Sequence, residues 1–69
     1  MYVHLKKLLS ERNISVKNYG AILGVSEKTA QNKLNGVTAF TLPEVNKTLE
    51  LFPEYVLNYL FANKGGDDD

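Results

Sequence analysis

The 69-residue sequence contains no cysteine and a single histidine, His4. Without cysteine, no disulfide bond or thiolate metal site can supplement the hydrophobic core. His4 has no second ligand at metal spacing, so we expect a surface or half-buried histidine, no metal site and no cofactor. A chain this short forms one domain, in which burial is only just sufficient for independent folding.

Long hydrophobic runs are also absent. No apolar stretch approaches the roughly 18 residues that a membrane-spanning helix needs. The first residues, MYVHLKKLL, hold lysines inside the apolar stretch and no small-residue cleavage site, which is unlike a signal peptide. We therefore expect a cytoplasmic protein with no membrane partner.

The residue sets of common catalytic sites are missing as well. The sequence shows no cysteine and histidine pair, no Ser-His-Asp set and no glycine-rich phosphate loop before a helix. So short a chain also has too few residues to enclose a deep pocket. These absences predict that the protein is not an enzyme and has no small-molecule substrate.

The chain lacks an excess of charge of either sign. Eight basic residues balance eight acidic ones, which gives a formal net charge of zero. Three of the acidic residues are Asp67, Asp68 and Asp69, and the rest of the chain carries eight basic against five acidic residues. This basic excess is smaller than that of a tight DNA binder, so the charge permits a nucleic-acid partner without requiring one.

Helical periodicity dominates the chain, and no strand pattern competes with it. Apolar residues recur at helical spacing over residues 2–12 and predict a first helix, which Asn13 ends in the left-handed conformation. Thr41 and Glu44 have the spacing of a capping box and predict the start of a fourth helix. The residues expected in the apolar stripe of that helix are Leu42, Val45, Leu49 and Phe52.

The fourth helix must end before Pro53, because the proline ring clashes with the preceding turn and the residue has no N–H. We expect Pro53 to start a fifth helix that runs to about Ala62. The residues that this helix offers for burial are Val56, Leu57, Tyr59, Leu60 and Phe61. The glycines and aspartates that follow predict a flexible acidic tail at residues 64–69.

The most informative segment is SVKNYGAILGVSEKTAQNKLNG, residues 15–36. Ser15 and Ser26 are each placed to cap a short helix, and Gly24 between them suits the left-handed residue that ends the first one. Gly20 lies inside the first helix, where glycine costs roughly 1 kcal/mol against alanine. Its presence predicts that the backbone of the second helix comes close at this point.

The second helix of this segment has two different faces. Ala30 and Leu34 are four residues apart and face inward. Polar side chains occupy the rest of its surface, namely Lys28, Thr29, Gln31, Asn32 and Asn35.

The Leu23-Gly24-Val25-Ser26 turn, Thr29 and the Asn35-Gly36 pair together resemble the helix-turn-helix of the phage Cro and repressor family, also called the XRE family. The match continues into Phe40-Thr41-Leu42 and Glu44, which look like the opening of the next helix in many small phage members. It covers roughly residues 2–62. The resemblance implies an all-α fold, a compact five-helix bundle with a helix-turn-helix domain over residues 1–63.

In such a domain the second helix of the motif, residues 27–35, enters the major groove. The residues predicted to contact bases are Ser26, Glu27, Lys28, Gln31 and Asn32. The residues predicted to contact phosphates are Val16, Lys17, Thr29, Asn35 and Thr38. The alternative is that these side chains form a solvated helix face. The other lysines, expected to serve mostly for solubility, are Lys6, Lys7, Lys33 and Lys47.

The preferred hypothesis is a sequence-specific, DNA-binding transcriptional regulator of phage or prophage type, such as a repressor, that binds double-stranded operator DNA. One copy has a small interface, so we expect a homodimer or a complex with a second phage regulator. Tyr55 and Tyr59, four residues apart, form the predicted dimer or partner surface. The alternative is a protein-binding modulator or antirepressor on the same fold, which the zero net charge and the absence of arginine from residues 27–35 favour.

Overall fold

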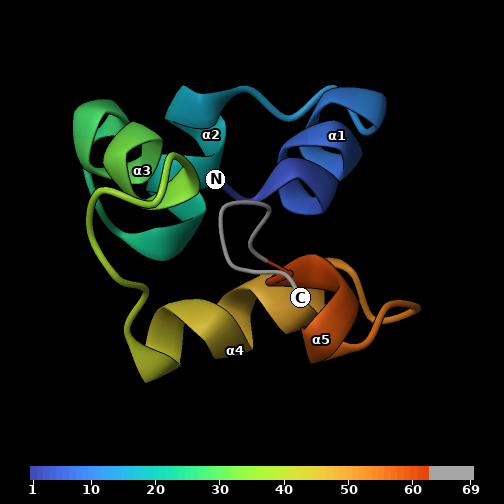
Figure 1. The fold of residues 1–69 in the computed structure, drawn as a ribbon. Helices are drawn as coiled ribbons and strands as arrows, with labels where there is room; N and C mark the ends of the chain where they lie inside the picture. Colours follow the sequence, from blue (N-terminus) through green and yellow to red (C-terminus); the bar gives the residue numbers. More distant parts are fainter. Residues whose placement is uncertain (63–69) are drawn as a thin grey trace.

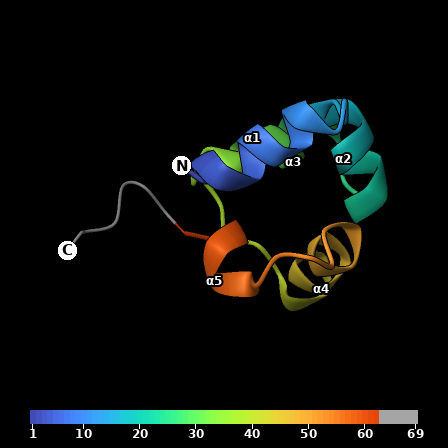
Figure 2. The same cartoon turned by 90° about the vertical axis from the view of Figure 1, so that its right-hand side faces the viewer.

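The computed structural model describes residues 1–62, which form helices and no strand. The helices are α1 (Val3–Glu11), α2 (Val16–Leu23), α3 (Glu27–Leu34), α4 (Leu42–Leu51) and α5 (Leu57–Leu60). The first three lie on one side of the molecule, and α4 and α5 lie across from them (Figures 1 and 2). The predicted all-α fold of five helices is confirmed, and the predicted acidic tail lies outside the described residues.

The segment from α2 to α3 begins and turns where its local signals predict. Ser15 and Ser26 are the N-caps of α2 and α3, and their hydroxyl oxygens accept from the backbone N–H groups of Asn18 at 3.0 Å and Thr29 at 3.1 Å. Gly24 ends α2 with a φ of +82°, a left-handed conformation that glycine adopts without steric cost. These bonds satisfy donors that helix ends leave unpaired, so both helices start at defined residues.

Gly20 brings α2 against the turn that precedes α3. A Cβ atom on this residue would lie 2.9 Å from the Val25 carbonyl oxygen and 3.1 Å from the Ser26 carbonyl oxygen. The Val25 N–H also donates to the Gly20 carbonyl oxygen at 2.8 Å. The predicted close approach of a second backbone is therefore confirmed, and it occurs at the turn and the N-cap of α3.

The hydrophobic core of residues 1–62 lies between the two groups of helices. Its buried apolar residues are Leu5, Leu8, Leu9, Tyr19, Leu23, Ala30, Leu34, Phe52 and Leu60. At its edge, Tyr2, Phe40 and Phe61 pack edge to face, with ring centroids 5.0 to 5.9 Å apart, a favoured geometry for aromatic rings. This aromatic cluster joins the N-terminal residues, the loop before α4 and the end of α5.

The buried face of α4 differs from the predicted stripe. Leu42 is 72% exposed, whereas Glu44, Thr48 and Phe52 face the core. Leu42 and Glu44 are two residues apart, which is about 200° around a helix. Because Glu44 faces the core, Leu42 is turned towards solvent, and the prediction for Leu42 was wrong.

Helix α5 is shorter than predicted. After Pro53 the chain makes a turn in which the Tyr55 N–H donates to the Phe52 carbonyl oxygen at 3.1 Å. Val56 is then extended, with a ψ of 158°, and gives α5 no side-chain cap. The helix consequently comprises only Leu57–Leu60. The turn after Pro53 is not helical and Val56 is extended, so no helix runs from Pro53 into α5.

Candidate nucleic-acid interface

The outward surface of α3 brings four of the predicted base-contacting residues together. Glu27, Lys28, Gln31 and Asn32 line one shallow hollow, and we call this surface the α3 polar face. Figure 1 shows α3 at an edge of the molecule, with α2 behind it. The α3 polar face carries one cation, one carboxylate and two amides. Each amide presents a donor beside an acceptor, the pattern that matches the major-groove edge of adenine.

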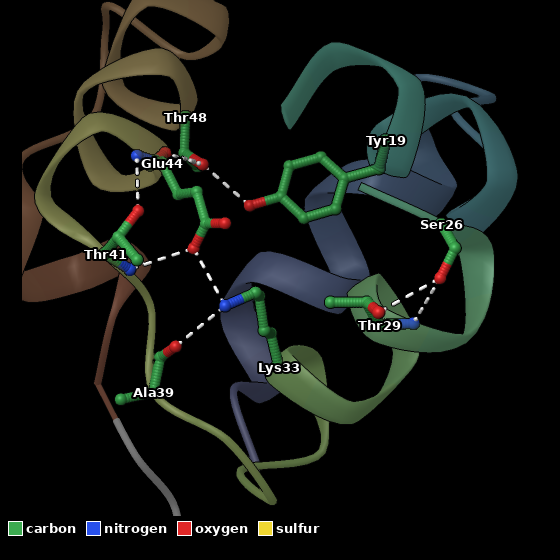
Figure 3. A network of polar contacts seen from close by, with 8 residues as sticks. All are labelled: Tyr19, Ser26, Thr29, Lys33, Ala39, Thr41, Glu44 and Thr48. Carbon is green, nitrogen blue, oxygen red and sulfur yellow. Dashed lines mark hydrogen bonds and ion pairs between the residues drawn. The ribbon is translucent and has the colours of Figure 1, made fainter. Parts of the chain in front are cut away.

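Ser26 and Thr29 are bonded to each other at the start of α3. The Ser26 hydroxyl accepts from the Thr29 N–H and donates to Thr29 Oγ1 at 3.0 Å (Figure 3). Ser26 is exposed and Thr29 is half-buried. Both hydroxyl groups thus stabilise the first turn of α3. A DNA contact from either residue would use a hydroxyl group that already forms hydrogen bonds in the helix cap.

Four of the predicted phosphate contacts, all but Thr29, form two groups that Lys6 of α1 connects. Val16 and Lys17 lie in the first turn of α2, where backbone N–H groups have no partner within the helix, and Val16 shares a groove with Lys6. The Lys6 ammonium also donates to Asn35 Oδ1, at 3.2 Å, at the C-cap of α3. Thr38 is exposed in the loop beyond. Lys6, expected to serve for solubility, therefore lies between the two groups.

A buried ion pair anchors the inner side of α3. Lys33 and Glu44 are 7% and 8% exposed, and Lys33 Nζ lies 3.0 Å from Glu44 Oε1. Lys33 also donates to the Ala39 carbonyl oxygen at 2.9 Å, and Glu44 accepts from the Thr41 N–H at 2.8 Å (Figure 3). The pair therefore joins α3, the loop at residues 35–41 and α4.

The interpretation of Lys33 as a solubility residue was wrong. Ala30, Lys33 and Leu34 have the i, i+3, i+4 spacing of one helix face, so Lys33 stands on the face that was predicted to be buried. Lysine is almost never fully buried unless it is paired. Its partner Glu44 lies on the next helix, and only the folding of the chain brings the two together.

The surroundings of Glu44 keep it ionised at neutral pH. Burial on its own raises the pKa of a carboxyl group. The Thr41 N–H and the Lys33 ammonium outweigh this effect and hold the pKa of Glu44 below its usual value. The Glu44 carboxylate thus accepts one hydrogen bond from the loop, at Thr41, and one from α3, at Lys33.

Tyr19 extends the same polar network to α2. Its hydroxyl oxygen lies 2.6 Å from Thr48 Oγ1, and Thr48 donates to the Glu44 carbonyl oxygen at 2.9 Å. Because Thr48 has one hydroxyl hydrogen, Tyr19 is the donor between the two hydroxyl groups. Burial raises the pKa of Tyr19 to about 12, an effect that the Thr48 hydrogen bond opposes and the Glu44 charge reinforces.

We expect the ionisation of Tyr19 to lower the stability of the protein at alkaline pH. A tyrosine in the unfolded chain loses its proton near pH 10, whereas the folded Tyr19 keeps it up to about pH 12. The free energy of unfolding should therefore fall as the pH rises through this range, by about 2–3 kcal/mol. Urea unfolding at a series of pH values measures the loss. Tyr19→Phe should remove it and the surface variant Tyr59→Phe should keep it, so equal profiles for the two variants would contradict this cause.

The predicted partner surface is a stack of aromatic rings. The rings of Tyr55 and Tyr59 have centroids 5.2 Å apart, and Tyr59 also stacks on the half-buried His4 at 4.4 Å. Tyr55 lies in the turn before α5, so the prediction that it belongs to the last helix was wrong. Between the two tyrosines in the chain, Val56 and Leu57 are 69% and 47% exposed, because the short α5 buries only Leu60 fully.

Comparison with protein-family models, with curated proteins and with solved structures finds no match for this chain. Within residues 1–62, no group of three or more histidine, cysteine, aspartate or glutamate residues is placed to hold a metal ion. The helices within these residues are too short or too polar to span a lipid bilayer. What points to a function is the arrangement of α2, α3 and the loop that follows α3.

Proposed function

We propose that the protein is a sequence-specific DNA-binding transcriptional regulator of the phage Cro and repressor type, rather than an enzyme. The observation that supports this function is the α3 polar face, where four hydrogen-bonding side chains gather in one hollow while the opposite face is buried. In helix-turn-helix complexes the N-terminal part of the second helix meets the base edges in the major groove. A regulator of this kind acts on operator DNA in the cytoplasm.

The groups on both sides of the α3 polar face suit the DNA backbone. The first turn of α2 offers N–H groups and the exposed Lys17, and helix N-termini favour phosphate oxygens. Beyond the C-terminal end of α3, Asn35 and Thr38 offer further polar groups, with Lys6 next to Asn35. Phosphate contacts of this kind fix the register of a protein on the duplex, so that base contacts can specify the sequence.

Gln31 and Lys17 should contribute to DNA binding in different ways. Gln31→Ala removes an amide that reads one base, so we expect discrimination at one position to relax by about 1–3 kcal/mol. Lys17→Ala removes a phosphate contact and should weaken binding to all duplexes alike. Selection from a random duplex pool, followed by titration of single duplexes, measures both effects, with Lys47→Ala as the control. Identical changes in sequence preference for the two variants would show that the assigned roles are wrong.

The salt dependence of binding tests the proposed function itself. A protein that neutralises phosphates releases counterions, so the logarithm of affinity falls linearly with the logarithm of salt concentration. Lys17 of α2 and Lys28 of α3 are the exposed cations of the proposed interface, so we expect a slope of about −2 for each bound copy. Fluorescence anisotropy of a labelled duplex over a series of salt concentrations measures the slope. Failure to bind any duplex at low salt would contradict the proposal.

One observation favours a second function, a protein-binding modulator or antirepressor on the same fold. Val56 and Leu57, which lie between Tyr55 and Tyr59 in the chain, are exposed, and residues 55–62 carry no charge. A neutral, apolar surface suits a protein partner such as another regulator or a second copy. Binding through this surface should respond little to salt. A dimer formed there would also serve the first function, because two copies can match a two-fold operator.

A further inference from the structure

We propose that the buried Lys33–Glu44 pair positions the α3 polar face and the loop at residues 35–41 for DNA readout. This inference rests on the proposed DNA-binding function. Neither residue of the pair lies on the outward surface of α3, since both are buried between α3 and α4. They are therefore positioning residues that act through the backbone and side chains they hold.

The contacts of the pair lead directly to the loop. Lys33 donates to the Ala39 carbonyl oxygen, and Glu44 accepts from the Thr41 N–H. Between α3 and these two anchor points lie Asn35 and Thr38, two of the five predicted phosphate contacts. The pair thus sets how far the loop stands from α3, and with it the spacing between phosphate contacts and base contacts.

Stability alone is a weak reason for an ion pair at this place. Removing an ammonium and a carboxylate from water carries a large desolvation cost, and well-packed apolar residues of similar volume often leave a protein as stable or more stable. The charged pair provides direction, because each charge is aimed at a particular backbone group of the loop (Figure 3). Apolar side chains would fill the same volume without fixing those groups.

The pair also has a required order. Lys33 faces a carbonyl oxygen and must donate, whereas Glu44 faces an N–H group and must accept. Exchanging the two, as Lys33→Glu with Glu44→Lys, keeps the mutual attraction. It sets a carboxylate against the Ala39 carbonyl oxygen and an ammonium against the Thr41 N–H. The exchange therefore separates a pair that only attracts from a pair that positions the loop.

The test compares the wild type with the apolar double variant Lys33→Met, Glu44→Leu and with the exchanged pair. Arg12→Gln with Glu54→Gln is the matched control, because it removes an ion pair on the surface, between the C-cap of α1 and the turn before α5. Each protein is followed by thermal unfolding, by amide hydrogen exchange in the loop at residues 35–41 and by titration with a DNA duplex at low salt.

We expect the apolar double variant to unfold at or above the wild-type temperature. Its loop amides should exchange faster, and its affinity for DNA should fall about tenfold, the equivalent of one lost base contact. In the variant with Lys33 and Glu44 exchanged, the loop amides should also exchange hydrogen faster than in the wild type. Its affinity for DNA should be about tenfold lower. The surface control should match the wild type in both the loop and DNA binding.

Wild-type loop exchange and wild-type affinity in the apolar variant would overturn the positioning role and leave the DNA-binding function standing. Wild-type affinity for DNA in the variant with the exchanged pair would overturn the positioning role too, because mutual attraction alone would then be enough for full DNA binding. If the apolar variant fails to fold, Lys33→Gln with Glu44→Gln provides the same comparison. Failure of the wild type to bind any duplex would overturn the DNA-binding function, and this inference with it.

Discussion

Replacing Lys33 with methionine alone should lower the free energy of unfolding by about 3 kcal/mol. The change leaves the Glu44 carboxylate buried without its ammonium partner, and breaking a buried pair in this way costs about 3–5 kcal/mol. We expect the low end of the range because Glu44 keeps its bond from the Thr41 N–H. Urea unfolding at neutral pH measures the loss. Lys47→Met, which removes an exposed lysine from α4, should change the same free energy by less than about 0.5 kcal/mol.

The pH dependence of this loss identifies its cause. In the wild type the pKa of Glu44 is lowered in the folded state, so its contribution is present above the unfolded pKa and is lost as the pH falls below about 4.5. In Lys33→Met, burial without the ammonium should raise the pKa of Glu44, and protonation should then relieve the buried charge. The difference between the two proteins should shrink on acidification, and a constant difference would contradict an electrostatic cause.

Replacing Gly20 with valine should cost about 3 kcal/mol, the upper end of the usual cost of overpacking. A Cβ atom at this position meets the Val25 carbonyl oxygen at 2.9 Å, and this backbone atom cannot turn aside as a flexible side chain would. Ala21→Val adds methyl groups on the exposed side of α2, where only helix propensity changes, by less than about 1 kcal/mol. Thermal unfolding of the two variants compares the positions. Losses of equal size would contradict the close approach of α2 to the turn.

Local rules predicted most of the helix boundaries. Ser15, Ser26 and Thr41 each accept from an N–H group three residues later, and Asn13 and Gly24 adopt the left-handed conformation, with φ values of +59° and +82°. Each of these features depends on chain neighbours alone. The sequence therefore carried enough information to place the starts of α2, α3 and α4.

The errors occurred where distant contacts decide the structure. The inward orientation of Glu44 follows from its partner Lys33 on another helix, and it is what leaves Leu42 in solvent. At the C-terminal end, apolar residues at helical spacing predicted a long helix, but Val56 is extended and does not cap one. A count of apolar positions does not show whether an uncapped segment of chain will continue a helix.

In the candidate site, too, some features could be predicted from local spacing and others depend on contacts between distant residues. The residues of the α3 polar face followed from the spacing of Ala30 and Leu34, because a buried face fixes its opposite. The bridge that Lys6 forms towards Asn35 joins α1 to the end of α3, so it became visible only in the folded chain. The same holds for the buried pair behind α3, whose partners come from two helices.

The measurement that most directly tests DNA binding by α3 is an amide chemical-shift titration with a generic DNA duplex at low salt. We predict shifts that fade as salt is added and that concentrate at the following residues: Lys17, Lys28, Gln31, Asn32 and the loop to Thr38. An unchanged spectrum would contradict DNA binding by this protein. Shifts confined to Tyr55 and Tyr59 would contradict readout by α3 and indicate that the aromatic surface is the binding site.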